Sequence, residues 1–425
     1  MLSRENLKAI LSEQRADLLK RDGGTLREEL AVVEKKIHLP HVLVITGIRR
    51  CGKSTLLRQI IKKDYQDEEF YYITFEDERL LGFKASEFSQ IYDALLDLYG
   101  EKKAFFLDEV QNIPGFDTFV RRFSDNGFKF FVTGSNARLL SHEISTRLTG
   151  RHLDVRLRPF SFSEFLELKG FENTKASAYK PASRSRLRAL FDEYLEHGGM
   201  PDYAKSHDRQ ILKQAYEDIV LKDIVVRRRI SNEMQLRELY RYVITNFANK
   251  YSYHSLAKTL GIKSVHSVKN YLGFLEEAYF MRQVCKFDYS YSKQIANERK
   301  PYICDNGFVT TLSARPMPDR GWLLENLVFG VLEPQGEVFY GSHGGQECDF
   351  LLVQGRRVKM AVQVAWELHE KNRKHEFGGL CKAMKAHKLK EGLLLTYEQE
   401  GERKTPEGKV IIKPVWKWLL EGKTR

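Results

Sequence analysis

The feature that most constrains the fold is a full match to the pattern G-x-x-x-x-G-K-S/T. Its residues are Gly47, Ile48, Arg49, Arg50, Cys51, Gly52, Lys53 and Ser54. The apolar run at 42–46 predicts a strand before it, and residues 54–61 predict a helix after it. Glycines at these places allow a turn in which backbone N–H groups and the positive end of the helix point at phosphate oxygens. The pattern predicts a nucleotide-binding loop, and the alternative is a chance match.

Two side chains at the end of this loop predict how phosphates would be held. Lys53 is expected to reach the β- and γ-phosphates as a compact cation, and the hydroxyl of Ser54 to hold Mg²⁺. Thr55 extends the polar start of the helix, so residues 47–55 form the predicted ATP site. Arg49 and Arg50 lie between the glycines, where contact with solvent or a partner is expected. ATP and Mg²⁺ are therefore the expected ligands.

A second motif ends in two carboxylates. Residues 103–109, KAFFLDE, predict an apolar strand followed by Asp108 and Glu109. In P-loop ATPases the first acid at such a strand end binds Mg²⁺ through water, and the second polarises the attacking water. We assign these roles to Asp108 and Glu109. The alternative is a strand that simply ends in acidic loop residues.

A third predicted strand, FKFFVTGSNA at 128–137, ends in polar side chains. Thr133, Ser135 and Asn136 would then lie at the same edge of the sheet as the two carboxylates. A polar group at this place is expected to sense the γ-phosphate. An ordinary Gly-Ser turn explains the same residues equally well.

The order of apolar and amphipathic segments predicts how the chain is divided. Short apolar runs alternate with amphipathic stretches between residues 36 and 160, which is typical of an α/β fold with a parallel sheet covered on both faces. Helical periodicity dominates residues 187–278, and strand-like runs return from about residue 287. At about 150 residues per domain, three domains are expected. They are an ATPase domain at 1–170, a helical region at 186–285 and a second α/β domain at 286–425.

Composition narrows the classes of protein. Hydrophobic residues make up 42% and charged residues 30%, which is typical of a globular chain rather than a disordered one. No apolar run approaches the roughly 20 residues that span a bilayer, so a cytoplasmic location without a membrane partner is expected. The net charge of +12 favours anionic partners such as nucleotides or nucleic acid. The five cysteines are scattered, which argues against a disulfide framework or a structural zinc site.

The motifs together resemble one family. The strings GIRRCGKSTLL, LDEVQNIPGF, FVTGSNARLLS and STRLTGR are similar to those of prokaryotic AAA+ type P-loop ATPases known only as ATP-binding proteins, which carry a C-terminal domain of unknown function. The resemblance covers nearly the whole chain. It implies that Arg147 or Arg151 contacts the γ-phosphate, with Arg151 able to act on the nucleotide of a neighbouring subunit in a homo-oligomer. The alternative for each is a surface or salt-bridged arginine.

The middle of the chain contains a candidate helix-turn-helix. No Asp or Glu occurs between Tyr251 and Leu275, while lysines and histidines occur among apolar residues at helical spacing. The second helix would present its first turns to the major groove of DNA. The candidate readers are Ser264, His266, Ser267 and Lys269. The alternative is a winged-helix module used only for packing between domains.

The last domain resembles the restriction-endonuclease-like fold. Its candidate site residues are Glu325 in a predicted helix, Asp349 at the end of EVFYGSHGGQECD, and Gln363 in the strand MAVQVAWEL. Such nucleases need clustered acids for Mg²⁺ and a lysine two residues after the last one, and this chain has Ala365 there. A degenerate nuclease-like site used for binding is therefore favoured over an active nuclease. An unrelated domain, in which Glu347 and Asp349 are turn acids, stays open.

These observations predict an ATPase and leave its output open. One hypothesis couples MgATP hydrolysis to DNA binding through the winged helix. A second is a nucleotide-controlled signalling or assembly switch that binds a protein partner. An ATP-dependent nuclease is the weakest of the three, because the lysine is missing.

Overall fold

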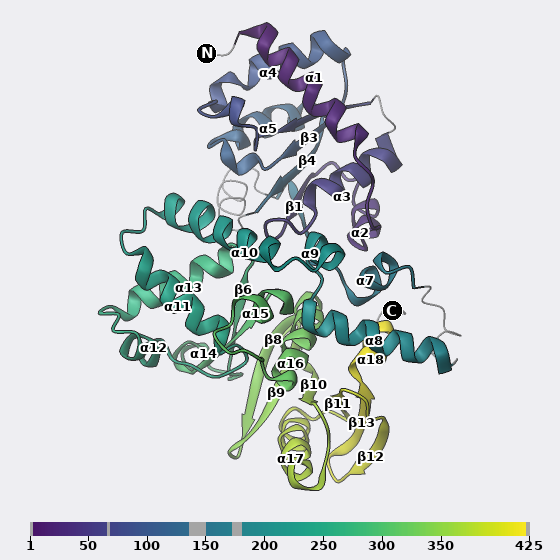
Figure 1. The fold of residues 1–425 in the computed structure, drawn as a ribbon, viewed down its shortest axis with the longest axis vertical. Coiled ribbons are helices and arrows are strands. Elements are labelled where there is room, and N and C mark those ends of the chain that lie inside the picture. Colours follow the sequence, from purple (N-terminus) through teal and green to yellow (C-terminus); the bar gives the residue numbers. More distant parts are fainter. Residues whose placement is uncertain (1–2, 66–68, 136–149, 172–180, 422–425) are drawn as a thin grey trace. The chain divides into compact units, whose positions relative to one another are not determined.

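The computed structural model describes residues 3–65, 69–135, 150–171 and 181–421. The chain forms two compact units (Figure 1). Unit 1 contains residues 1–159 and 277–279, and unit 2 contains residues 160–276 and 280–425. The finer division into ranges 1–170, 186–285 and 286–425 stays a prediction. No helix among the described residues is long and apolar enough to cross a membrane.

Unit 1 is built on a five-stranded parallel sheet, as the alternation of segments predicted. The strand order is β2-β3-β4-β1-β5. The strands are β1 (Val42–Thr46), β2 (Phe70–Thr74), β3 (Ala104–Asp108), β4 (Lys129–Gly134) and β5 (His152–Arg156). Because β1 lies between β4 and β5 while its following helix leads to β2 at the sheet edge, the direction of winding changes beside β1. In open α/β sheets, ligands bind at the carboxyl ends of strands at such a point.

Helices cover both faces of this sheet, as predicted (Figure 1). On one face, Leu11, Ile91, Phe105 and Phe130 share a core formed by α1, α4, α5 and the strands. On the other face, Phe106 stacks on Phe131, and both meet the ring of Tyr65. The helical elements of unit 1 are α1 (Arg4–Lys20), α2 (Glu29–Glu34), α3 (Lys53–Ile60), the π-helix η1 (Ile61–Tyr65), α4 (Phe88–Tyr99), α5 (Phe116–Asp125), and the 3₁₀ turns η3 (Glu78–Leu80), η4 (Ala85–Glu87) and η5 (Val110–Asn112).

Unit 2 begins with helices, as the periodicity of residues 187–278 predicted. They are α7 (Phe162–Leu168), α8 (Pro181–His197), α9 (Pro201–Ser206), α10 (Arg209–Asp218), the π-helix η6 (Ile219–Val226), α11 (Glu233–Thr245), α12 (Tyr253–Thr259) and α13 (Val265–Glu277). An antiparallel pair follows, β6 (Met281–Cys285) with β7 (Arg299–Ile303), and α14 (Tyr291–Ala296) lies in their connection. The pair places Lys300 next to Val284 in a buried strand.

The rest of unit 2 contains a six-stranded mixed sheet in the order β12-β13-β11-β10-β9-β8. Its strands are β8 (Glu337–His343), β9 (Gln346–Gln354), β10 (Arg357–Ala365), β11 (Glu391–Thr396), β12 (Gly401–Thr405) and β13 (Gly408–Pro414). The helical elements are α15 (Asn306–Leu312), α16 (Arg320–Leu332), the 3₁₀ turn η7 (Glu333–Gln335), α17 (Glu370–His387) and α18 (Val415–Glu421). Helix α17 connects the parallel neighbours β10 and β11 and packs on β9. A Cβ at Gly379 would lie 1.7 Å from the carbonyl oxygen of Glu347, so this close approach requires glycine.

Candidate functional site

The predicted phosphate loop leaves β1 at Thr46 and enters α3 at Lys53. Gly47 and Gly52 both have positive φ, 154° and 99°. A Cβ at Gly47 would lie 2.3 Å from the carbonyl oxygen of Leu157, so the chain cannot pass there with a larger residue. The buried guanidinium of Arg27 donates to the carbonyl oxygen of Cys51 at 2.7 Å, and this hydrogen bond holds the loop in place. The local fold therefore depends on both glycines of the motif.

Lys53 is buried, and its ammonium group has three oxygen partners. It forms an ion pair with Glu109 at 3.1 Å and donates to the carbonyl oxygens of Gly47 at 3.3 Å and Ile48 at 3.4 Å. Burial opposes the charged form, but the charge and hydrogen bond of Glu109 together with the charges of Cys51 and Asp108 outweigh it, so the pKa of Lys53 is raised. The lysine is thus a permanent cation at the start of α3.

Asp108 is held at the end of β3 by hydroxyl groups from three other elements. Ser54 donates to Oδ2 at 2.6 Å, Tyr72 donates to the same oxygen at 3.3 Å, and Thr133 donates to Oδ1. Burial and the charge of Glu109 raise the pKa of Asp108, while the hydrogen bonds from Ser54 and Thr133 oppose this. The structure thus brings together Ser54 and Asp108, the two residues predicted to hold Mg²⁺.

Glu109 turns sharply out of the strand. Its backbone is left-handed, with φ 50° and ψ 44°, and its N–H donates to Thr133 Oγ1 at 2.9 Å. The amide of Gln111 donates to Glu109 Oε2 and to Ser135 Oγ, the latter at 3.3 Å. Burial would raise the pKa of Glu109, but the charges of Lys53 and Arg49 lower it below its ordinary value. The carboxylate is fixed and ionised.

These residues fit a nucleotide with Mg²⁺. The glycine loop has no room for a Cβ at Gly47 and delivers its chain to a helix start, where phosphate oxygens are stabilised. A hydroxyl and a carboxylate, from Ser54 and Asp108, offer the hard oxygen ligands that Mg²⁺ prefers. Beside Glu109, the buried Oε1 of Gln111 has no hydrogen-bond partner within the described residues. This atom marks a place for a polar group next to the carboxylate.

The remaining predicted residues of the loop have other surroundings. Arg49 forms an ion pair with Glu76 at 2.8 Å, and Arg50 is exposed with φ 66°. Ile48 and Cys51 are buried, and burial raises the pKa of the Cys51 thiol. Thr55 is half-buried in the first turn of α3. None of these observations tests their predicted contact with ATP.

Of the residues predicted to contact or sense the γ-phosphate, some lie within the described part of the chain and some outside it. Arg151 is about half exposed and forms an ion pair with Asp125 of its own unit. Its action on a neighbouring subunit stays a prediction. Arg147 and Asn136 lie outside the described residues, so only Thr133 and Ser135 of the third motif can be placed. Both are buried at the end of β4, in contact with the carboxylates or with Gln111.

The candidate helix-turn-helix of unit 2 consists of α12 and α13. Val268, Leu272 and Leu275 are buried, while His266 and Lys269 are exposed and Ser267 is half-buried. Ser264 precedes α13 and its hydroxyl accepts from the N–H of Ser267 at 3.3 Å, as a helix cap does. The first turn of α13 therefore presents polar and basic side chains. The antiparallel β6–β7 pair follows directly.

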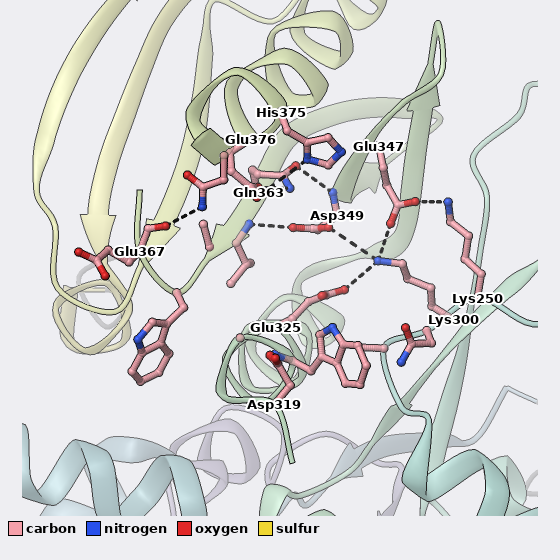
Figure 2. A pocket seen from close by; sticks show the side chains of 18 of the residues that line it. Lys250, Lys300, Asp319, Glu325, Glu347, Asp349, Gln363, Glu367, His375 and Glu376 are labelled. Carbon is pink, nitrogen blue, oxygen red and sulfur yellow. Dashed lines mark hydrogen bonds and ion pairs between the residues drawn. The ribbon is translucent and has the colours of Figure 1, made fainter. Parts of the chain in front are cut away.

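The structure also brings together Glu325, Asp349 and Gln363, which line one cavity of ≈ 1010 Å³ in unit 2 (Figure 2). Gln363 accepts from the N–H of Asp349 at 3.3 Å and donates to Glu376 at 2.9 Å. The N–H of Val364 donates to Asp349 Oδ2 at 2.9 Å. Burial and the charge of Glu325 raise the pKa of Asp349 well above its ordinary value. Whether this sheet is nuclease-like stays a prediction.

Comparison with known proteins supports the assignment of unit 1. Residues 40–166 match the model of an AAA domain, and residues 188–319 match a domain of unknown function (DUF8612). An uncharacterized protein of Methanocaldococcus jannaschii is 35% identical over 407 residues, covering 91% of this chain and 90% of the relative. An uncharacterized protein of Haemophilus influenzae is 30% identical over 347 residues, covering 77% and 83%. The chain belongs to a family of AAA-domain proteins that includes both relatives.

Solved structures give a more distant likeness. The RuvB Holliday junction branch migration motor of Thermotoga maritima is 17% identical, with a TM-score of 0.29 over 67% of this chain and 90% of that chain. The ORC1 protein of Aeropyrum pernix in complex with DNA is 12% identical, with a TM-score of 0.31 over 76% and 97%. At TM-scores this low the likeness carries no information about activity.

Three residues that contact the predicted site residues were not themselves predicted to be site residues. In the AAA domain these are Tyr72 and Gln111, which contact the two carboxylates from β2 and η5. In unit 2 the missed residue is Lys300, whose ammonium lies among Glu325, Glu347 and Asp349. A lysine inside the strand RKPYI was the available signal, because lysine is almost never buried unless it is paired.

Proposed function

We propose that the AAA domain binds and hydrolyses MgATP, and that the nucleotide state is coupled to DNA binding through α12 and α13 of unit 2. The observation that carries the ATPase proposal is the convergence of Lys53, Ser54, Asp108 and Glu109 at the carboxyl ends of β1 and β3. They come from two motifs 54 positions apart in the sequence and meet in space. A chance match to either motif does not explain this.

Lys53 would neutralise phosphate oxygens at the glycine loop. Its present partners, Glu109 and two loop carbonyls, occupy the ammonium at distances of 3.1–3.4 Å. An incoming triphosphate carries more charge than one carboxylate, so it is expected to draw Lys53 away from Glu109. Mg²⁺, held by Ser54 and Asp108, would supply positive charge that neutralises the developing negative charge on phosphate oxygens.

Separation from Lys53 would prepare Glu109 as a base. The charge of Lys53 is the main influence that lowers the pKa of Glu109. When the ammonium moves to phosphate, that lowering weakens and the carboxylate binds a proton more readily. Gln111 would keep the carboxylate oriented, and Glu109 could then accept a proton from water. ATP binding itself thereby converts a paired carboxylate into a catalytic one.

The DNA part of the proposal depends on the exposed start of α13. His266 and Lys269 are exposed there, and no acidic residue occurs between Tyr251 and Leu275. The buried side of the same helix anchors it, so its exposed side can enter a groove as a rigid unit. The net charge of +12 supports an anionic partner. Homo-oligomer formation, with Arg151 acting in trans, belongs to the same proposal.

One observation favours a protein-binding switch as the second candidate. Tyr289, Tyr291 and Ile295, in and beside α14, are large apolar side chains that are 83%, 76% and 47% exposed. Exposed apolar side chains gathered on one short segment are more typical of a protein contact than of a solvated surface. In this alternative, nucleotide would control assembly and DNA would have no effect on turnover.

The deciding experiment is steady-state MgATP hydrolysis by the wild type and by Glu109→Gln, without nucleic acid, with single-stranded DNA and with duplex DNA. The measurements use near-physiological salt, because non-specific attraction to phosphates falls steeply with salt. Stimulation by DNA in the wild type alone is expected. Hydrolysis that is indifferent to both forms would reject the DNA coupling and favour the protein-binding switch. Absence of hydrolysis under every condition would reject the ATPase proposal.

A further inference from the structure

Lys300 occupies an unusual place in unit 2. It stands on β7, its side chain is only 6% exposed, and its ammonium faces carboxylates from two other elements. Nζ lies 2.6 Å from Glu347 Oε1, 2.9 Å from Glu325 Oε1 and 3.7 Å from Asp349 Oδ1 (Figure 2). Glu325 comes from α16, and Glu347 and Asp349 come from the same face of β9. A single cation thus gathers three carboxylates around one point.

The surrounding groups complete a fixed cage. Tyr302 donates to Glu325 Oε1 at 2.5 Å, Lys250 pairs with Glu347 Oε2, and the N–H of Val364 donates to Asp349 Oδ2. Each carboxylate therefore keeps one oxygen directed at Lys300 while a second contact fixes its orientation. The charges of the carboxylates outweigh burial and raise the pKa of Lys300 well above its ordinary value. The ammonium stays charged.

Carboxylate oxygens arranged in this way can bind a cation, and in this protein the cation is the ammonium group of Lys300. Three carboxylate oxygens converging on one point are hard ligands of the kind that Mg²⁺ and Mn²⁺ take. Ala365, the last residue of β10, lines the same cavity. Lys300 reaches the acids from a different strand and stands between them instead of beside them.

We propose that Lys300 is a built-in cation that takes the place of a divalent metal ion among Glu325, Glu347 and Asp349. The wild-type cluster does not bind Mg²⁺ or Mn²⁺, because the ammonium occupies the point where the carboxylates converge. Removal of the side chain opens a site for one divalent ion, since three carboxyl groups then face each other and, among the described residues, Lys250 pairs with Glu347. The inference concerns unit 2 alone and is independent of the nucleotide site.

The position of Lys300 also limits which reactions the cavity can support. Two tryptophans, Trp322 and Trp366, line it together with the acids and Lys250. Hydrolysis of phosphodiesters with metal ions at these acids would require Lys300 to leave three carboxylates at once. A metal-dependent cleavage reaction in this cavity is therefore not expected.

The test is a Mn²⁺ titration followed by electron paramagnetic resonance, in the absence of nucleotide. Every chain carries Asp108→Asn, so that the AAA domain contributes no carboxylate at its own Mg²⁺ position. The parent is the chain that carries Asp108→Asn alone. Lys300→Ala in this background is expected to bind one Mn²⁺ more than the parent, and its affinity for this ion should be at least tenfold higher than the parent's. Adding Asp349→Asn to Lys300→Ala should abolish the gain, because an amide then replaces one of the three converging carboxyl groups.

Lys300→Met is the matched control for space. It removes the charge but fills the place of the ammonium, so it should bind Mn²⁺ no better than the parent. An equal gain in Lys300→Met and Lys300→Ala would place the new ion elsewhere and overturn the proposal. So would a Mn²⁺ site in the parent that is lost with Asp349→Asn, or a folded Lys300→Ala chain that gains none.

Folding of the variant is checked in the same samples by far-ultraviolet circular dichroism and tryptophan fluorescence. If Lys300→Ala is unfolded without metal, Mn²⁺ should restore its folded spectra, because an ion that binds only the folded state shifts the equilibrium towards it. Failure of millimolar Mn²⁺ to do so, while Lys300→Met folds, would contradict the proposal.

Discussion

Lys53 in unit 1 and Lys300 in unit 2 are both buried, and both contact carboxylates. Lys53 has one carboxylate partner, Glu109, and its other partners are carbonyl oxygens of the glycine loop. Lys300 has three carboxylate neighbours and lies in the buried strand β7. The first can exchange its single carboxylate for phosphate beside the N–H groups of a helix start. An anion approaching the second would be repelled by three acids.

The difference shows that a buried lysine is defined by what surrounds it. A glycine loop and a helix start make Lys53 the cationic part of an anion site. A strand and three acids make Lys300 the cation of a cation site, and its ammonium leaves no place among the acids for a second cation. The same chemical group therefore serves binding in one unit and neutralisation in the other. Five predictions test this contrast.

The largest effect is expected for turnover in Glu109→Gln. The amide keeps the shape of the side chain but cannot accept a proton, and loss of a general base costs about 10²–10⁴-fold in rate. Nucleotide binding should be retained or tightened, because Lys53 loses the carboxylate that competes with phosphate. Steady-state hydrolysis and ATP titration together measure the two effects. Wild-type turnover in this variant would show that Glu109 is not the base.

Lys300→Met should destabilise unit 2 by about 3–5 kcal/mol, because removal of one partner leaves uncompensated buried charge. Lys53→Met should lower the free energy of unfolding by a smaller amount, since it leaves one carboxylate without its lysine instead of three. All four tryptophans follow residue 320, so urea unfolding by tryptophan fluorescence reports on unit 2 and circular dichroism reports on both units. Equal losses in the two variants would remove the contrast between the lysines.

Asp305 shows what a buried carboxylate does without a lysine. Within the described part of the chain it accepts backbone N–H groups, from Gly199 at 2.6 Å and Gly307 at 2.9 Å, and burial raises its pKa from 3.8 to about 6. The folded state therefore binds this proton more tightly than the unfolded state. The associated stability is complete below pH 3.8 and is lost as pH rises through about 6, a loss of roughly 3 kcal/mol.

The measurement for Asp305 is urea unfolding of the wild type and Asp305→Asn between pH 4.5 and 7.5. The asparagine variant should be less stable than the wild type at low pH and should recover relative to it as pH rises, because asparagine does not ionise. A difference between the two chains that does not change with pH would contradict the raised pKa.

Lys53→Ala should weaken ATP binding by roughly 100-fold, since charge-assisted contacts to phosphate are lost. Lys62→Ala is the matched control, because Lys62 is exposed just after α3 and faces no phosphate site. Lys300→Met should bind ATP like the wild type. A nucleotide affinity that responds equally to Lys53 and Lys62 would refute the loop assignment.

The smallest effect is expected for Lys269→Glu, which should weaken DNA binding about tenfold and leave basal ATP hydrolysis unchanged. Lys404→Glu changes the net charge equally on the exposed strand β12 and serves as the control. Fluorescence anisotropy with a labelled duplex at two salt concentrations separates the two variants. Equal affinity for both would place DNA, if it binds, away from α13.

Elements were predicted best from the sequence where the residues of a segment by themselves indicate that it is buried. The apolar runs that became β1, β3 and β4 were recognised because parallel strands are covered on both faces and read as continuous apolar segments. Helix α16, which contains Glu325, was predicted as well. The N-terminal helix α1 was missed, because its apolar positions Leu7, Ile10 and Leu11 lie among many charged residues. Strand β12, GERKT, was missed because its pairing with β13 alone makes it a strand.

The sequence by itself determined the loop at 47–54 and the acids that end β3, because glycines, a lysine and a strand end in that order admit few other structures. Local spacing was sufficient there, since each motif is continuous in the chain. Only the tertiary structure decided that Tyr72 and Gln111 contact the two carboxylates, and that Lys300 stands among Glu325, Glu347 and Asp349. Those contacts join residues from separate elements, and their energies arise from burial and charge that exist only after the elements have packed.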